Sequence, residues 1–96
     1  MSKDPLLQPF LLKNLTLRNR IMTTSHEPAY PEDGMPKERY RAYHEERAKA
    51  GVALAMTAGS AAVSKDSPPV FNNVLEYKDE VVPWIQNLTD GCHEHG

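Results

Sequence analysis

The sequence predicts an α/β protein with a parallel sheet, entered through an antiparallel hairpin. Two observations support this fold class. Strand-like and helix-like segments alternate along most of the chain, and this alternation is typical of right-handed βαβ units. In the helix-like segments, residues that would share one helix face recur every three or four positions. The strand-like segments are short and dense in apolar or β-branched residues.

The composition is that of an ordinary globular domain. The chain has 96 residues, of which 40% are hydrophobic and 25% charged, and its net charge is −2. A charge this close to zero lacks the positive field that draws a protein to nucleic acid. The longest nearly apolar run is far shorter than the ~20 residues of a membrane-spanning helix. The length allows one small domain or part of a larger one, and we expect neither a nucleic-acid nor a membrane partner.

The amino terminus and the cysteine content indicate a cytoplasmic protein without internal disulfide bonds. Met1 to Pro5 are followed by no apolar signal segment. Cys92 is the only cysteine, which excludes an internal disulfide. Cys92, His93 and His95 are close together, but residues one or two apart on a helix point to different faces. The sequence therefore predicts no metal site.

The first third of the chain predicts a hairpin, a strand and a loop. Apolar residues on both sides of Lys13–Asn14 predict a small hairpin within residues 9–21. The β-favouring run Ile21–Thr24 predicts the first strand of the parallel sheet. A proline-rich loop follows, and Pro36 is suited to the first turn of the next helix.

The middle of the chain predicts a helix and a second strand. Helix formers fill Lys37–Lys49, and Tyr40, Tyr43, Arg47 and Ala50 are spaced to lie on one face. We expect both tyrosines to pack against the sheet, and Arg47 with Glu45 and Glu46 to form a solvated face. Gly51 ends the helix, and the apolar run Val52–Thr57 predicts a strand buried on both sides.

The last third predicts a long connection and a final helix. Residues 60–78 contain Pro68–Pro69 and several small polar residues, and loops of such length are usually functional. The final helix is expected over Asp79–His95, with Val82, Ile85, Leu88 and Thr89 on its apolar stripe.

These elements do not make a closed fold. Two parallel strands flanked by two helices leave the strand edges and much apolar surface uncovered. A closed (β/α)8 barrel needs about 250 residues, of which this chain would supply the hairpin and the first two βα units. The fold class is therefore an incomplete barrel, completed by the remainder of the barrel or by a homo-oligomer.

Several motifs resemble the amino-terminal quarter of the old yellow enzyme family, whose members are FMN-dependent NADH:flavin oxidoreductases on a TIM barrel. The resemblance extends from Leu7 to Gly96 and follows the family's order and spacing. It rests on Leu15–Ile21, Asp33–Gly34, Arg47–Val52, Thr57–Ala61, Leu88–Asp90 and His95–Gly96. It implies that Arg18 and Arg20 are structural residues at the bottom of the barrel.

The resemblance also implies a flavin site. The end of the first strand lies against the isoalloxazine ring in this family, and the matching positions are Thr24, Ser25 and His26. At the end of the second strand, Gly59 matches a small residue that lets the ring approach the backbone. Each has an ordinary structural alternative, as turn, loop or strand-exit residues. The resemblance assigns no catalytic residue to this chain.

Three departures from the family pattern refine this expectation. Ser25 stands where many members have proline, and Ala58 where they usually have glutamate. Glu27 stands where trimethylamine dehydrogenase and its relatives carry the cysteine that attaches to the flavin. A carboxylate cannot form that bond, so the resemblance implies non-covalent FMN. His26 is shared with the branch that contains amine dehydrogenases, N-demethylases and dienoyl-CoA reductases.

The resemblance thus implies that residues 1–96 are the amino-terminal part of a single FMN-binding TIM-barrel domain, in an FMN-dependent oxidoreductase. The parent protein would transfer hydride equivalents between NAD(P)H, or a small amine or enoyl substrate, and an acceptor, with oxidative N-demethylation as one such reaction. We expect the 96-residue piece alone to be inactive. The alternative is a small interaction module that recruits a partner strand through its exposed sheet edge.

Overall fold

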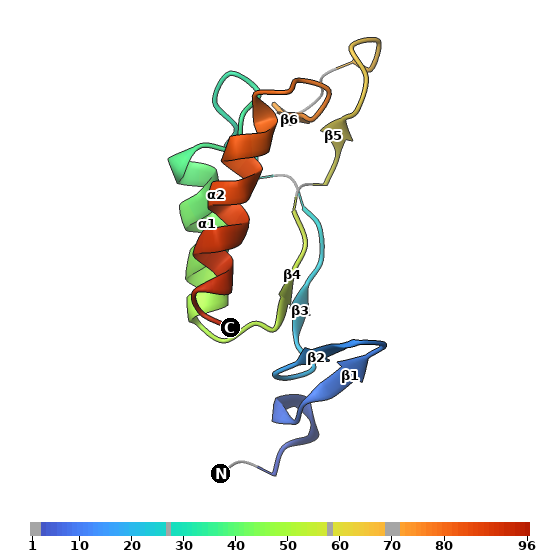
Figure 1. The fold of residues 1–96 in the computed structure, drawn as a ribbon, viewed down its shortest axis with the longest axis vertical. Helices are drawn as coiled ribbons and strands as arrows, with labels where there is room; N and C mark the ends of the chain where they lie inside the picture. The colour runs from blue at the N-terminus through green and yellow to red at the C-terminus, as the bar shows by residue number, and fades with distance from the viewer. Residues whose placement is uncertain (1–2, 27, 58, 69–71) are drawn as a thin grey trace.

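The computed structural model describes residues 3–26, 28–57, 59–68 and 72–96, so Glu27 and Ala58 lie outside the described residues. A short 3-10 helix precedes three small two-stranded sheets and two longer helices (Figure 1). The elements are η1 (Pro5–Leu7), β1 (Phe10–Leu12), β2 (Leu15–Leu17), β3 (Met22–Thr23), α1 (Glu38–Lys49), β4 (Leu54–Ala55), β5 (Ala61–Ala62), β6 (Val74–Leu75) and α2 (Val81–His93).

The predicted hairpin is confirmed. β1 and β2 pair antiparallel with Leu12 opposite Leu15. Lys13 takes a φ of 54° in the turn between them. The apolar side chains of this hairpin are open to solvent, and Leu11 is 66% exposed. The hairpin therefore projects from one end of the molecule without a core of its own (Figure 1).

The first predicted βαβ unit is also confirmed. β3 and β4 pair in parallel with Met22 opposite Leu54, and α1 connects them. Asn19 aligns the starts of the two strands, because its amide nitrogen donates to the carbonyl of Gly51 at 2.6 Å. Its amide oxygen accepts from the backbone N–H of Ile21 at 3.0 Å. The strands are shorter than the predicted runs Ile21–Thr24 and Val52–Thr57.

The predicted face of α1 was wrong in part. Tyr40 is 1% exposed, as expected, but its buried companions are His44 and Ala48, which follow it at intervals of four residues. Tyr43 is only half-buried. Pro36 lies before the helix, ahead of the N-cap Lys37, rather than in its first turn.

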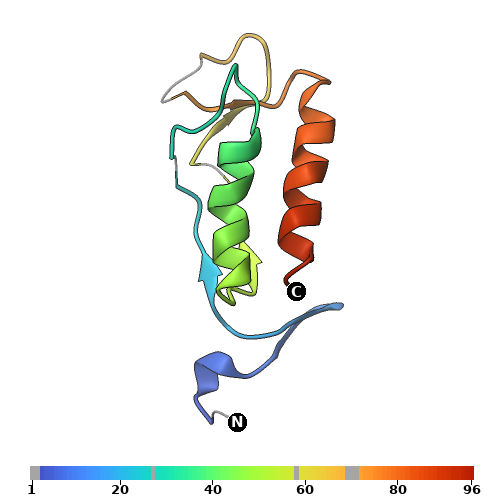
Figure 2. The same cartoon turned by 90° about the vertical axis from the view of Figure 1, so that its left-hand side faces the viewer.

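Helix α2 runs beside α1 in the same direction (Figures 1 and 2). Its predicted apolar stripe was shifted by one residue at its start, because Val81 is buried whereas Val82 is 62% exposed. Val81 and Leu88 are seven residues apart, or two helical turns, so they share one face. Gly91 completes the buried face, and a Cβ there would meet Glu45 Oε2 of α1 at 3.0 Å.

Residues 60–78 are more than the predicted loop. They contain β5 and β6, which pair in parallel with Ala61 opposite Val74. The backbone N–H of Leu75 donates to the carbonyl of Gly34 at 2.9 Å. Gly34 has a φ of +75°, and a Cβ there would clash with the side chain of Leu75. The loop before α1 thus packs against β6, and the positive φ and close approach at this position require glycine.

The core lies between the two helices and the loops above them. Its buried members are Met35, Tyr40, Val74, Val81 and Leu88. The molecule is elongated, with extents of 48 × 23 × 21 Å and a radius of gyration of 14.9 Å, against about 13 Å for a compact domain of this length. The described residues contain no helix long and apolar enough to cross a membrane.

Candidate functional site at the strand exits

The predicted site residues follow two paired strands. Thr24, Ser25 and His26 come directly after β3, and Gly59 comes four residues after β4. The two strands are parallel with Thr23 opposite Ala55, so both chains leave the sheet at its same end. All four residues are exposed. The fold therefore brings two segments that are distant in the sequence to one end of the sheet, as the ends of β3 and β4 show (Figure 1).

His26 has a partner that the sequence did not predict. The hydroxyl of Tyr43, from α1, lies 2.6 Å from His26 Nε2 and 3.2 Å from Nδ1. The two rings also meet edge to face, with centroids 5.3 Å apart. The sequence placed Tyr43 in the core, and nothing in its helical spacing indicated a contact with a loop residue 17 positions earlier.

Behind this pair lies a buried histidine. His44 is 4% exposed, and neither ring nitrogen has a hydrogen-bond partner in the described part of the chain. Burial lowers the pKa of His44, and the nearby Arg47 and His26 lower it further. His44 is consequently uncharged at neutral pH. No sequence pattern indicated that this residue is buried, because it lies in the most polar part of the helix.

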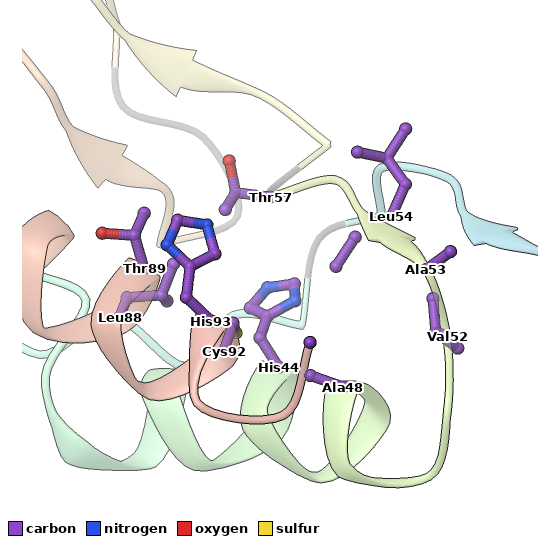
Figure 3. A pocket seen from close by; sticks show the side chains of 12 residues that line it. His44, Ala48, Val52, Ala53, Leu54, Thr57, Leu88, Thr89, Cys92 and His93 are labelled. Carbon is purple, nitrogen blue, oxygen red and sulfur yellow. The ribbon is translucent and has the colours of Figure 1, made fainter. Parts of the chain in front are cut away.

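A cavity of about 170 Å³ lies between α1, α2 and β4, and Thr57 from the exit of β4 also lines it. The rings of His44 and His93 extend into it, and Cys92 lies beside them (Figure 3). Burial raises the pKa of the Cys92 thiol, and the charge of Glu45 raises it further. Cys92 therefore stays protonated and is a poor nucleophile or metal ligand. None of the four predicted site residues lines this cavity.

The opposite end of the sheet is held by Arg18. Its guanidinium donates to the carbonyls of Ala48 at 2.6 Å and Val52 at 2.9 Å, and also to the carbonyl of His95. Ala48 is in the last turn of α1 and His95 follows the end of α2, where backbone carbonyls lack partners within a helix. Arg20 lies over the ring of Phe10 at 5.5 Å. Both arginines have the structural contacts expected of them.

One group of potential metal ligands occurs in the described part of the chain. Single ligand atoms of Glu45, Glu94 and His95 lie within 4.8 Å of one another. His95 Nε2 is 3.3 Å from Glu45 Oε1, so the cluster already forms an ion pair when His95 is protonated. It includes neither Cys92 nor His93. The expectation that the chain binds no metal stays a prediction.

The strand exits suit a flat cofactor. Ser25 and Gly59 are small and exposed, so neither side chain fills the space in front of the backbone. Thr24, Ser25 and His26 add hydroxyl and imidazole groups that can bond to the polar edge of an isoalloxazine ring. Their size, exposure and polar groups are compatible with the group that the resemblance implied, and the ring of His26 is contacted by a residue of another element.

Relatives of known name match the whole chain. It is 75% identical over 96 residues to a protein of Rhizobium meliloti (strain 1021) named "Probable N-methylproline demethylase". It is 50% identical over 95 residues to the "Multifunctional alkene reductase/demethylase OYE" of Caballeronia cordobensis. These matches cover 100% and 99% of this chain. The chain spans only 14% of the length of each relative.

Solved structures confirm the fold. A 2-naphthoyl-CoA reductase complex matches 96% of the chain with a TM-score of 0.87 and 19% identity, over 14% of its own length. The old yellow enzyme from Trypanosoma cruzi matches 94% with a TM-score of 0.76 and 20% identity, over 24% of its length. The described elements are thus the hairpin and first βα units of an incomplete TIM barrel.

The assignment to a family rests on the sequence itself. Residues 5–96, nearly the whole chain, match the sequence profile of a single family. The same residues carry the motifs of the old yellow enzymes and form the strand exits described above. The chain belongs to the NADH:flavin oxidoreductase / NADH oxidase family.

Proposed function

We propose that the full-length protein is an FMN-dependent oxidoreductase that removes N-methyl groups from small amino acids. The observation that carries the proposal furthest is the 75% identity to the protein named as an N-methylproline demethylase. A further relative, 43% identical over 98 residues, is named "N,N-dimethylglycine/sarcosine dehydrogenase". These names share one substrate class, an N-methylated amino acid.

Within this chain, we assign non-covalent FMN to Thr24, Ser25, His26 and Gly59. The support is their exposure and the shared end of β3 and β4. Gly59 would let the ring approach the backbone, and His26 and Ser25 would bond to its polar edge. When bound, FMN supplies the acceptor for a hydride equivalent from the substrate and passes the electrons onward. The proton donor and the substrate-binding residues would come from other parts of the full-length protein.

A second activity has its own support. The 50% identical relative is named as both an alkene reductase and a demethylase. In alkene reduction, NAD(P)H would supply the electrons and an activated enoyl compound would accept them. We rank this activity second because the relative with 75% identity carries only the demethylase name. The alternative of a small interaction module has no support from these relatives, which are longer enzymes.

The test is made on the purified full-length protein. We expect absorption bands near ~450 nm, a property of any flavin, and release of the yellow cofactor on acid precipitation, because the binding is non-covalent. Without oxygen, N-methylproline should bleach the bands and release formaldehyde after water adds to the oxidised C–N bond. Proline is the control, because it lacks the methyl group.

Each result decides a separate part of the proposal. A protein without flavin bands, even after FMN is added, would overturn the cofactor assignment. NADH could bleach the flavin bands and an enoyl compound restore them, while N-methylproline leaves them unchanged. That result would replace the demethylase assignment with alkene reduction.

A further inference from the structure

The ring of His26 is held by a residue from another element. The loop after β3 brings His26 against α1, where the Tyr43 hydroxyl lies 2.6 Å from Nε2. This distance is at the short end of the range for hydrogen bonds. The edge-to-face contact of the rings, at 63°, adds a second restraint on the imidazole. An exposed histidine would otherwise sample several rotamers.

Tyr43 is itself held from several sides. The guanidinium carbon of Arg47 lies 3.6 Å from the centre of its ring, and Arg47 Nη1 donates to the Tyr43 carbonyl at 2.8 Å. Tyr30 and His44 meet the ring edge to face, with centroids 5.6 Å and 5.1 Å away. His44 is buried, so this side of the cluster is anchored inside the fold. The phenol therefore has one orientation, with its hydroxyl directed at His26.

We infer that Tyr43 is a positioning residue, which fixes the imidazole of His26 at the carboxyl end of β3 so that it meets the flavin in one orientation. The inference rests on the proposed function, in which His26 contacts FMN. Arg47 acts one step further back, because its guanidinium holds the face of the Tyr43 ring. Helix α1 thereby contributes to the site although none of its residues was predicted there.

The test uses the full-length holoprotein with four variants. Tyr43→Phe keeps the ring contacts and removes only the hydroxyl. His26→Ala removes its partner, and the third variant combines both changes. Tyr30→Phe is the matched control, because Tyr30 also contacts the Tyr43 ring and also loses one hydroxyl. Two quantities are measured for each protein: the dissociation constant of added FMN and the reduction potential of the bound flavin.

Tyr43→Phe should weaken FMN binding roughly three- to tenfold, the effect of one lost hydrogen bond. It should shift the reduction potential in the same direction as His26→Ala. In the combined variant, Tyr43→Phe should add nothing to the effect of His26→Ala, because its effect passes through that ring. Tyr30→Phe should match the wild type in both measurements.

Two results would overturn the inference. Tyr43→Phe could leave both quantities unchanged, or its effect could add fully to that of His26→Ala. If Tyr43→Phe lowers the yield of folded protein, Arg47→Lys is the second variant, since it keeps the hydroxyl and removes the planar stacking. It should show the same dependence on His26, and an effect independent of His26 would contradict the inference. A wild-type protein that binds no FMN would instead refute the proposed function beneath it.

Discussion

At the scale of single residues, His44 makes the stability of the fold depend on pH. It is an almost fully buried imidazole, and its ring nitrogens have no hydrogen-bond partner in the described part of the chain. Burial, followed by the charges of Arg47 and His26, lowers its pKa from the ordinary 6.5. The unfolded chain therefore binds a proton at mildly acidic pH more readily than the folded chain does. The contribution of neutral His44 to the free energy of unfolding is therefore fully present above pH 6.5 and is lost as the pH falls below that value.

The corresponding prediction concerns the full-length protein. Its thermal midpoint should decrease as the pH falls from 6.5 toward about 5.5, and His44→Phe should reduce that decrease. His93→Phe is the control, because His93 lines the same cavity but is exposed, whereas His44 is buried. Calorimetry of the three proteins at several pH values measures the effect. An identical pH slope in the wild type and in His44→Phe would show that another group is responsible.

The proposed site residues come from the family motifs alone. Thr24, Ser25, His26 and Gly59 were named from motifs in chain order, and their role in binding a flavin stays a prediction. The parallel pairing of β3 and β4 shows only that the two strands end at the same end of the sheet. Tyr43 was missed because its contact with His26 depends on how the loop after β3 crosses α1. A pattern with a period of 3.6 residues records which face of a helix is apolar, but not which loop residue lies against it.

At the scale of elements, Arg18 joins three segments. It donates to a carbonyl at the end of α1, to the carbonyl of Val52 before β4 and to a carbonyl after α2. The positive charge of Arg18 also interacts favourably with the negative ends of the two helix dipoles. Arg18 therefore holds both helices to the start of the second strand of the unit.

Arg18→Lys should lower the free energy of unfolding by about 1–2 kcal/mol, because a single ammonium group cannot reach three carbonyls in the way a planar guanidinium does. Arg20→Lys is the matched control. Arg20 makes one long side-chain hydrogen bond, at 3.5 Å, with the carbonyl of Pro9, and a lysine can also lie over the ring of Phe10, so we expect a change within about 0.5 kcal/mol. Urea-induced unfolding of each variant and of the wild type measures both changes in the free energy of unfolding. Equal losses in the two variants would contradict the bridging role of Arg18.

Elements with strong local signals were predicted, and elements without them were not. The hairpin, α1, α2 and the pair β3 and β4 followed from turn residues, helix formers and apolar or β-branched runs. The pair β5 and β6 was missed because its two strands lie in a segment with many small polar residues and prolines, without the longer apolar runs that contain β3 and β4. The apolar stripe of α2 was misplaced at Val81–Val82, where two identical side chains leave the choice to tertiary packing.

At the scale of the whole molecule, the structure is an open part of a barrel. The core joins the helices to the loops at the carboxyl ends of the strands, while the hairpin exposes its leucines. A second cavity, of about 330 Å³ and mostly apolar, lies between the hairpin and the start of β3 and β4. The sequence predicted this incompleteness from the count of strands, but it could not predict the sizes of the uncovered surfaces.

The decisive measurement is the FMN content of the full-length protein with Gly59→Leu. A leucine at the exit of β4 should occupy the space of the isoalloxazine ring, so the variant should lose its FMN while its circular dichroism spectrum stays that of the wild type. Ala50→Leu, which adds a similar side chain at the exposed carboxyl end of α1, should keep its FMN. A folded Gly59→Leu protein with one FMN per chain would show that the flavin does not lie against the two strand exits.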